Sequence, residues 1–207
     1  MLLKSKTIQL LLLTIVVIGS STLQAQPSGL IGKKIQPFSL KNIDQSIISL
    51  NSLKETKGCI VIFTCNHCPF AKLYSKRLNE LNKKYRRKGV PLMAINSMDS
   101  LIYKEESFSF MQKKAIAENY KFYYLQDGTQ EVGKLFSAKH TPQAFVIWKE
   151  KENWILKYAG AIDDNGENPS KAKSYIASAV DELLAGKSVS KSETASFGCR
   201  IFYRKNQ

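Results

Sequence analysis

Residues 59–70 join an apolar run to two closely spaced cysteines, and this stretch constrains the fold more than any other. The run CIVIFT is β-branched or aromatic almost throughout, as expected of a central strand that is covered on both faces. From Cys68 to Lys88, apolar residues recur three or four positions apart, which predicts a helix that stops at Gly89. Cys65 and Cys68 are therefore expected where a buried strand meets a helix.

Similar patterns predict the other elements. Residues 33–57 predict a β-hairpin, strands are expected at 90–96, 122–126, 144–148 and 154–160, and helices at 105–119, 131–136 and 169–185. Alternating strands and helices imply right-handed parallel crossovers, and the last two strands form an antiparallel hairpin. We predict an α/β fold, a three-layer α/β/α sandwich with a mixed central sheet and an N-terminal β-hairpin extension.

The first 25 residues predict a secretory signal peptide. Lys4 and Lys6 precede an apolar run over residues 8–18, and the cut is expected after Ala25. The run is shorter than the about 20 residues of a membrane span, and an uncleaved anchor is the alternative. We expect an exported protein, periplasmic or secreted, with no membrane span in its mature form. One domain is expected over residues 29–186, followed by a tail over residues 187–207 that docks on it.

The formal net charge of the chain is +14, and removing Lys4 and Lys6 leaves +12. Most basic residues lie on the predicted helices and alternate with apolar residues, which favours solvated outer faces. Attraction to acidic partners or anionic membrane surfaces is the alternative interpretation. No nucleic-acid-binding motif is evident, and no nucleic-acid partner is expected.

The spacing of Cys65 and Cys68 favours thiol chemistry. A sulfur at a helix N-terminus faces free backbone N–H groups, so we expect a lowered pKa for Cys65 and a nucleophilic thiolate. Cys68, one turn further on, is suited to resolve a mixed disulfide formed by Cys65. A purely structural bridge would close a very short loop and stabilise little. His67 either donates toward the Cys65 thiolate or faces solvent.

Thr141-Pro142 precedes the fourth predicted strand, and an X-Pro bond at such a place is often cis. The backbone before it would then be presented for pairing with an extended substrate. His140, the other histidine of the chain, comes directly before this dipeptide.

These features resemble the thioredoxin superfamily, and within it the redoxin branch of peroxiredoxin-like and TlpA/ResA-like proteins. The resemblance rests on FTCNHCPFAK, GVPLMAIN, QDGTQEVGKLFSAKHTPQAFVI, YAGAIDD and GCRI, and it covers residues 29–202. It implies a thioredoxin fold with Cys65 as nucleophile, Cys68 as resolving thiol, and Thr141 and Pro142 as a substrate-binding cis-proline loop.

The sequence departs from the family pattern at two places. Many thioredoxins carry a buried acid six residues before the first active-site cysteine, and Cys59 stands there in this chain. A peroxiredoxin needs a threonine three residues before its peroxidatic cysteine. Thr64 lies four residues before Cys68 and directly before Cys65, which favours thiol–disulfide exchange over peroxide chemistry. Cys59 itself is expected to be a small core residue.

Cys199 lies in FGCRIFY, an apolar part of the tail, and is either a third redox thiol or a small docked residue. The leading hypothesis is an exported thiol–disulfide oxidoreductase that needs no cofactor and acts on protein or small-molecule thiols and disulfides. Antioxidant peroxide reduction, with Cys65 resolved by Cys68 or Cys199, is an alternative. A Cu(I)- or Zn-binding metallochaperone, with Cys65, Cys68 and His140 as ligands, is another.

Overall fold

The computed structural model describes residues 29–53 and 55–205, which form an α/β domain around a mixed sheet. The predicted signal peptide lies outside the described residues and stays a prediction. The strand order is β1-β9-β8-β4-β5-β6-β2-β3. The strands of this sheet are β1 (Lys34–Ile35), β2 (Ser39–Asn42), β3 (Ile47–Ser49), β4 (Gly58–Phe63), β5 (Leu92–Asn96), β6 (Tyr123–Gln126), β8 (Gln143–Glu150) and β9 (Asn153–Gly160).

The directions of the strands follow the prediction. β4, β5 and β6 pair in parallel, whereas β8 pairs antiparallel with both β4 and β9. β2 and β3 form the predicted N-terminal hairpin. β2 pairs antiparallel with β6, so this hairpin lies at the edge of the sheet opposite β1 and β9. A separate two-stranded sheet pairs β7 (His140–Thr141) with β10 (Cys199–Arg200).

Both faces of the central sheet are covered, which explains why β4 and β5 are buried throughout and almost entirely apolar. Alternate residues of β4 enter two different cores: Ile60 and Ile62 pack on one face, and Val61 and Phe63 on the other. The first face is covered by α2 (Ser75–Tyr85), α3 (Phe108–Ala117) and α5 (Tyr175–Leu184). The second is covered by α4 (Glu131–Leu135) together with apolar residues of the N-terminal strands and the tail.

The helix predicted from Cys68 to Lys88 is interrupted. It consists of α1 (Pro69–Lys72), α2 and the 3₁₀ turn η2 (Arg86–Lys88). At the break, the amides of Leu73 and Tyr74 bond three residues back, and the buried Tyr74 hydroxyl donates to Asp163 at 2.9 Å. This contact with a residue far along the chain lies at the break, where the apolar spacing alone predicts continuous helix.

Three further 3₁₀ turns lie along the described chain: η1 (Leu50–Ser52), η3 (Lys104–Glu106) and η4 (Pro169–Lys171). The prediction that Pro169 begins the last helix is wrong, because α5 starts after Ser174, whose hydroxyl accepts from the amide of Ala177. Among residues 29–53 and 55–205, no helix is both long and apolar enough to cross a bilayer.

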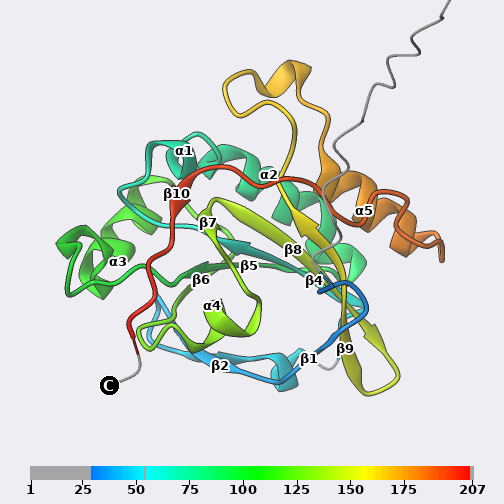
Figure 1. The fold of residues 1–207 in the computed structure, drawn as a ribbon, viewed down its shortest axis with the longest axis horizontal. Coiled ribbons are helices and arrows are strands. Elements are labelled where there is room, and N and C mark those ends of the chain that lie inside the picture. Colours follow the sequence, from blue (N-terminus) through cyan, green and yellow to red (C-terminus); the bar gives the residue numbers. More distant parts are fainter. Residues whose placement is uncertain (1–28, 54, 206–207) are drawn as a thin grey trace, which may run out of the picture.

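The C-terminal segment returns to the middle of the domain. In Figure 1 it is coloured red, crosses the view from α5 to β10 and then descends to the C-terminus. It is held to the domain on both sides of β10: Thr194 pairs with the backbone of Ala159, and the buried Ile201 donates its amide to the carbonyl of Lys139. The tail thereby brings Cys199 beside the residues that follow β4.

Candidate active site

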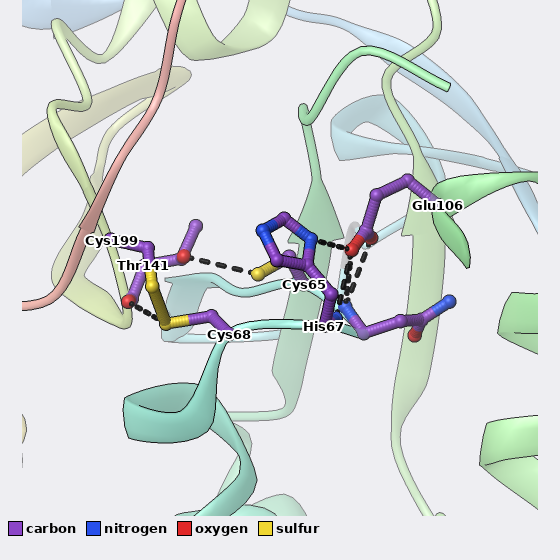
Figure 2. The surroundings of a disulfide bond; sticks show 7 residues. Cys65, His67, Cys68, Glu106, Thr141 and Cys199 are labelled. Carbon is purple, nitrogen blue, oxygen red and sulfur yellow. Dashed lines mark hydrogen bonds and ion pairs between the residues drawn. A yellow bond between two sulfur atoms is a disulfide. The ribbon is translucent and has the colours of Figure 1, made fainter. Parts of the chain in front are cut away.

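Three of the four cysteines meet at Thr141. Cys68 forms a disulfide with Cys199, 131 residues away, with 6.0 Å between the two Cα atoms. Cys65 is a free thiol whose sulfur lies 3.1 Å from the Thr141 hydroxyl oxygen (Figure 2). The Cys68 sulfur lies 3.1 Å from the Thr141 carbonyl oxygen. A disulfide sulfur carries no proton, so this last contact becomes a hydrogen bond only after reduction.

The predicted position of Cys65 needs a correction. Cys68, and not Cys65, is the N-cap residue of α1, and Cys65 lies before it in the loop that follows β4. Cys65 is fully buried, and burial together with the charge of Glu106 raises the pKa of its thiol to about 11. The expected lowering of this pKa is wrong, because desolvation and a neighbouring carboxylate both disfavour the thiolate. The hydrogen bond to Thr141 and the charge of Lys114 act in the opposite direction.

Glu106 organises the loop between the two cysteines, and sequence reasoning missed it. Its buried carboxylate accepts hydrogen bonds from the backbone amides of Asn66 and His67, and from the Asn96 side chain at 2.6 Å. Hydrogen bonds from backbone amides to a buried carboxylate are charge-assisted and strong. Glu106 directly follows Glu105, whose side chain is exposed, and nothing in the local sequence separates the two. A carboxylate therefore stands beside Cys65 although Cys59 replaces the acid of many thioredoxins.

The Nδ1 atom of His67 points toward Glu106, and not toward solvent or Cys65. This nitrogen lies 2.5 Å from Oε1 of Glu106, and the ring stacks on Tyr103 with 4.6 Å between centroids. Figure 2 shows the imidazole turned toward the Glu106 carboxylate above the Cys65 side chain. Glu106 thus fixes the orientation of His67, and the expected donation to the Cys65 thiolate has no counterpart among the described contacts.

The Thr141–Pro142 peptide bond is cis, as predicted. The side-chain oxygen of Gln143 accepts from the amides of Lys139 and His140 at 2.7 and 3.2 Å and so holds the residues before this bond. The backbone of Thr141 and His140 pairs with Cys199 and Arg200 of the same chain. The strand edge expected for an extended substrate is therefore occupied by the tail.

His140 does not join the cysteines. Its Nδ1 atom lies 2.9 Å from the Ser196 hydroxyl, and burial, with Lys139 and Arg200 nearby, lowers its pKa. Within the described part of the chain, one group of histidine, cysteine and acidic side chains lies close enough together to hold a metal ion. It consists of Cys65, His67 and Glu106. Their ligand atoms lie within 4.8 Å of one another. The expected ligand set of Cys65, Cys68 and His140 is not assembled in this disulfide form.

Cys59 is a core residue, as predicted. It is fully buried among apolar side chains of β4 and its neighbours, and burial raises the pKa of its thiol. It therefore differs from the three cysteines that meet at Thr141.

Comparison with known proteins agrees with this architecture. An uncharacterized conserved protein from Geobacillus kaustophilus is 35% identical, with a TM-score of 0.78 over 86% of this chain and 94% of that one. A hypothetical protein from Sinorhizobium meliloti is 29% identical, with a TM-score of 0.76 over 85% and 96%. The thioredoxin domain of a thiol-disulfide oxidoreductase from Bacteroides vulgatus, 14% identical, shares the fold, with a TM-score of 0.51 over 63% and 89%. No curated protein matches the chain.

The similarity to solved structures confirms the predicted thioredoxin-like fold. The sequence profile of the AhpC/TSA family matches residues 31–156, which is more than half of the 207 residues. That segment runs from before β1 into β9, so it contains the loop of Cys65 and Cys68 as well as the cis-proline residues. The chain belongs to the AhpC/TSA family of redoxins with a thioredoxin fold.

Proposed function

We propose that the protein is an exported thiol–disulfide oxidoreductase in which Cys65, Cys68 and Cys199 share one disulfide. One observation carries this proposal: Cys68 is bonded to Cys199 while the free Cys65 contacts the same residue, Thr141. Cys68 is thus placed between two partners. It is bonded to one, and the C-x-x-C spacing allows it to bond to the other.

In the proposed reaction, the Cys65 thiolate attacks a substrate disulfide, forms a mixed disulfide and releases one substrate thiolate. The Cys68 thiolate attacks the Cys65 sulfur and releases the second substrate thiolate. The Cys199 thiolate then attacks Cys68, which forms the Cys68–Cys199 bond and releases Cys65, which takes up a proton. Two protein thiols are oxidised and one substrate disulfide is reduced. Run in reverse, the same steps oxidise a dithiol substrate.

The surroundings of Cys65 suit a free, protonated thiol. Burial and Glu106 raise the pKa of Cys65, so the free cysteine is favoured in its protonated form. Cys65 as a neutral thiol is compatible with its buried position against the Thr141 hydroxyl. A raised pKa also makes Cys65 the poorer leaving group, so the Cys68–Cys199 bond itself, and not this pKa, supports that pair as the resting disulfide.

The test is a redox titration of the chain from Gln26 in glutathione buffers, with alkylation and mass spectrometry to identify each cysteine pair. We expect a reversible two-electron transition with Cys68–Cys199 as the main disulfide. Cys199→Ser should retain a transition through Cys65–Cys68, and Cys68→Ser should lose the internal transition altogether. Cys59→Ser, which removes the core cysteine, is the matched control and should titrate like the unaltered chain. Absence of any transition in the folded chain would refute the proposal.

Peroxide reduction is a second candidate, favoured by the match to the AhpC/TSA family. Cys65 would be oxidised to a sulfenic acid, and Cys68 would condense with it and release water. Peroxide consumption that depends on Cys65 and runs faster than exchange with disulfides would favour this candidate.

Metal binding is a third candidate, favoured by the proximity of Cys65, His67 and Glu106. These ligand types suit Zn²⁺, but the Glu106 carboxylate already accepts hydrogen bonds from Asn66, His67 and Asn96. Near-stoichiometric zinc or copper in the untreated protein, lost in Glu106→Gln, would favour this candidate over thiol exchange.

A further inference from the structure

The two cysteines of the disulfide differ in exposure. Cys68 has no solvent-exposed surface, and the same is true of Cys65. Cys199 is partly exposed, and its neighbour Arg200 is exposed. Thiol–disulfide exchange requires in-line approach to one particular sulfur, so the accessible sulfur is the one attacked. Exposure therefore favours Cys199 over Cys68 as the cysteine that an external thiol meets in the oxidised protein.

The strand edge beside the disulfide is closed to a long substrate. β10 pairs with β7 through Cys199 opposite Thr141 and Arg200 opposite His140. Gly198 lies so close to this edge that an added Cβ would stand 2.2 Å from the Thr141 carbonyl oxygen. An extended polypeptide has to displace the tail before it can pair with β7, whereas a small thiol does not.

The contacts that hold the tail do not depend on the disulfide. On one side, the Thr194 amide donates to the Ala159 carbonyl at 3.1 Å, and the Thr194 hydroxyl oxygen accepts from the Ala161 amide at 2.9 Å. On the other side, the Tyr203 hydroxyl donates to the Ala138 carbonyl at 2.7 Å, and Arg204 forms an ion pair with Asp99 at 2.9 Å. The tail is therefore expected to keep Cys199 beside Cys68 after reduction.

The surroundings of Cys199 are positively charged. Arg200 follows it directly, and Lys139 precedes the paired residue His140. Both cations are exposed, and within residues 29–53 and 55–205 neither forms an ion pair with a carboxylate. The whole chain carries a formal charge of +14. Unpaired cations around a reacting sulfur raise the local concentration of anionic reactants.

We propose that Cys199 is the cysteine attacked by an external reductant, and that this reductant is a small anionic thiol. The inference rests on the exchange function proposed above. The thiolate bonds to the Cys199 sulfur, the bond to Cys68 breaks, and Cys68 leaves as a thiolate. A second small thiolate then attacks the sulfur of the first small thiol in the mixed disulfide. The bond to Cys199 breaks, and the small disulfide and the Cys199 thiolate are released. Two small thiols are oxidised, and the protein disulfide is reduced.

The first experiment measures the reduction rate of the oxidised chain with three thiols of one size but different charge. The probes are 2-mercaptoethanesulfonate, 2-mercaptoethanol and cysteamine, and each rate is divided by the thiolate fraction of the probe. We expect the anionic probe to react about tenfold faster than the cationic one at low salt, with a smaller ratio at high salt. Arg200→Gln should lower the anionic rate about threefold. Arg87→Gln, the same charge change on η2, should leave it unchanged.

The second experiment identifies the attacked sulfur and tests the size of the substrate. The mixed disulfide with mercaptoethanesulfonate is trapped in acid and mapped by mass spectrometry. We expect the adduct on the tryptic peptide SETASFGCR, which carries Cys199. A short acidic peptide with one central cysteine should react more slowly per thiolate than mercaptoethanesulfonate.

The outcomes separate this inference from the proposed function. An adduct on Cys68, equal rates for all three charges, or faster reaction of the acidic peptide would overturn the inference and leave exchange intact. If no thiol reduces Cys68–Cys199 in the folded chain, and reduction occurs only in denaturant, the exchange function itself fails.

Discussion

Cys65 and Cys68 are three residues apart, yet they are held by two different kinds of structure. The loop that carries Cys65 is fixed by a buried charge, because the Glu106 carboxylate accepts hydrogen bonds from the backbone amides of Asn66 and His67. Cys68 is fixed by a covalent bond to a tail that pairs with β7. The first arrangement depends on a buried charge, and the second on redox state. The difference shows how one C-x-x-C motif can place its two sulfurs under separate control.

The largest effect is expected on the disulfide side. Cys199→Ser removes a bond between residues 131 positions apart, and loop-closure entropy predicts a loss of about 5 kcal/mol in the free energy of unfolding. Urea unfolding of both proteins under oxidising conditions measures this loss. With both proteins reduced, the difference should shrink below about 1 kcal/mol. An equal loss in both redox states would mean that the Cys199 side chain stabilises the tail by packing and not through the bond.

On the Cys65 side, the loop should depend on the charge of Glu106. Glu106→Gln replaces one carboxylate oxygen by an amide group that faces donors, and we expect a loss of about 2–3 kcal/mol in either redox state. Glu105→Gln, a change in the exposed neighbour, is the matched control and should stay within about 0.5 kcal/mol. Similar unfolding curves for the two variants would show that the loop does not rely on the buried charge.

The pairing of the tail with β7 gives a smaller effect. Gly198 has a φ of 142°, and an added Cβ would stand 2.2 Å from the Thr141 carbonyl oxygen. Gly198→Ala should therefore shift β10 and destabilise the chain by about 1–3 kcal/mol, with faster reduction of Cys68–Cys199. Gly186→Ala is the control, because Gly186 also has a positive φ, of 71°, but has no atom within 4 Å of an added Cβ. If both variants are reduced at the unaltered rate, the edge contact does not protect the disulfide.

Much of this fold could be predicted from the sequence, because strands and amphipathic helices follow from periods of two and about 3.6 residues. The errors fall where distant residues decide local structure. The helix after Cys68 breaks at Tyr74, whose hydroxyl donates a hydrogen bond to the distant Asp163. The site shows the same limit. C-x-x-C and Thr141-Pro142 are visible as motifs, whereas the role of Glu106 requires the fold that brings it to Asn66.

The pairing of Cys68 with Cys199 was open for a related reason. Cysteine spacing does not fix connectivity, and only the folded tail brings the two Cα atoms to 6.0 Å. The apolar residues around Cys199 indicated docking but not the position where the tail docks. Local patterns thus predicted which residues matter at the site, and tertiary contacts decided which of them are joined.

The finest test concerns the pKa of Cys65 in the disulfide form. Its thiol should titrate at about 11, above the ordinary 9.0, because burial and Glu106 disfavour the thiolate. The rate of alkylation of Cys65 should therefore rise about tenfold per pH unit up to about pH 11, whereas the rate for an ordinary thiol levels off near pH 9. The level of the plateau reports access to the sulfur, and the midpoint reports the pKa, so the two causes of slow alkylation are separable. The more strongly shifted Cys59 provides an internal reference.

Two charge variants should move this midpoint in opposite directions. Glu106→Gln removes a charge that raises the pKa of Cys65 and should lower the midpoint, whereas Lys114→Gln removes a charge that lowers it and should raise the midpoint. Because a raised thiol pKa favours the folded state only below the unfolded value, stability should also decline from about pH 9 to about pH 11. Lys113→Gln, at the exposed neighbouring position on α3, should leave the midpoint in place. A midpoint at 9 in all variants would show that the fold does not shift the pKa of Cys65 and would remove the contrast between the two cysteines.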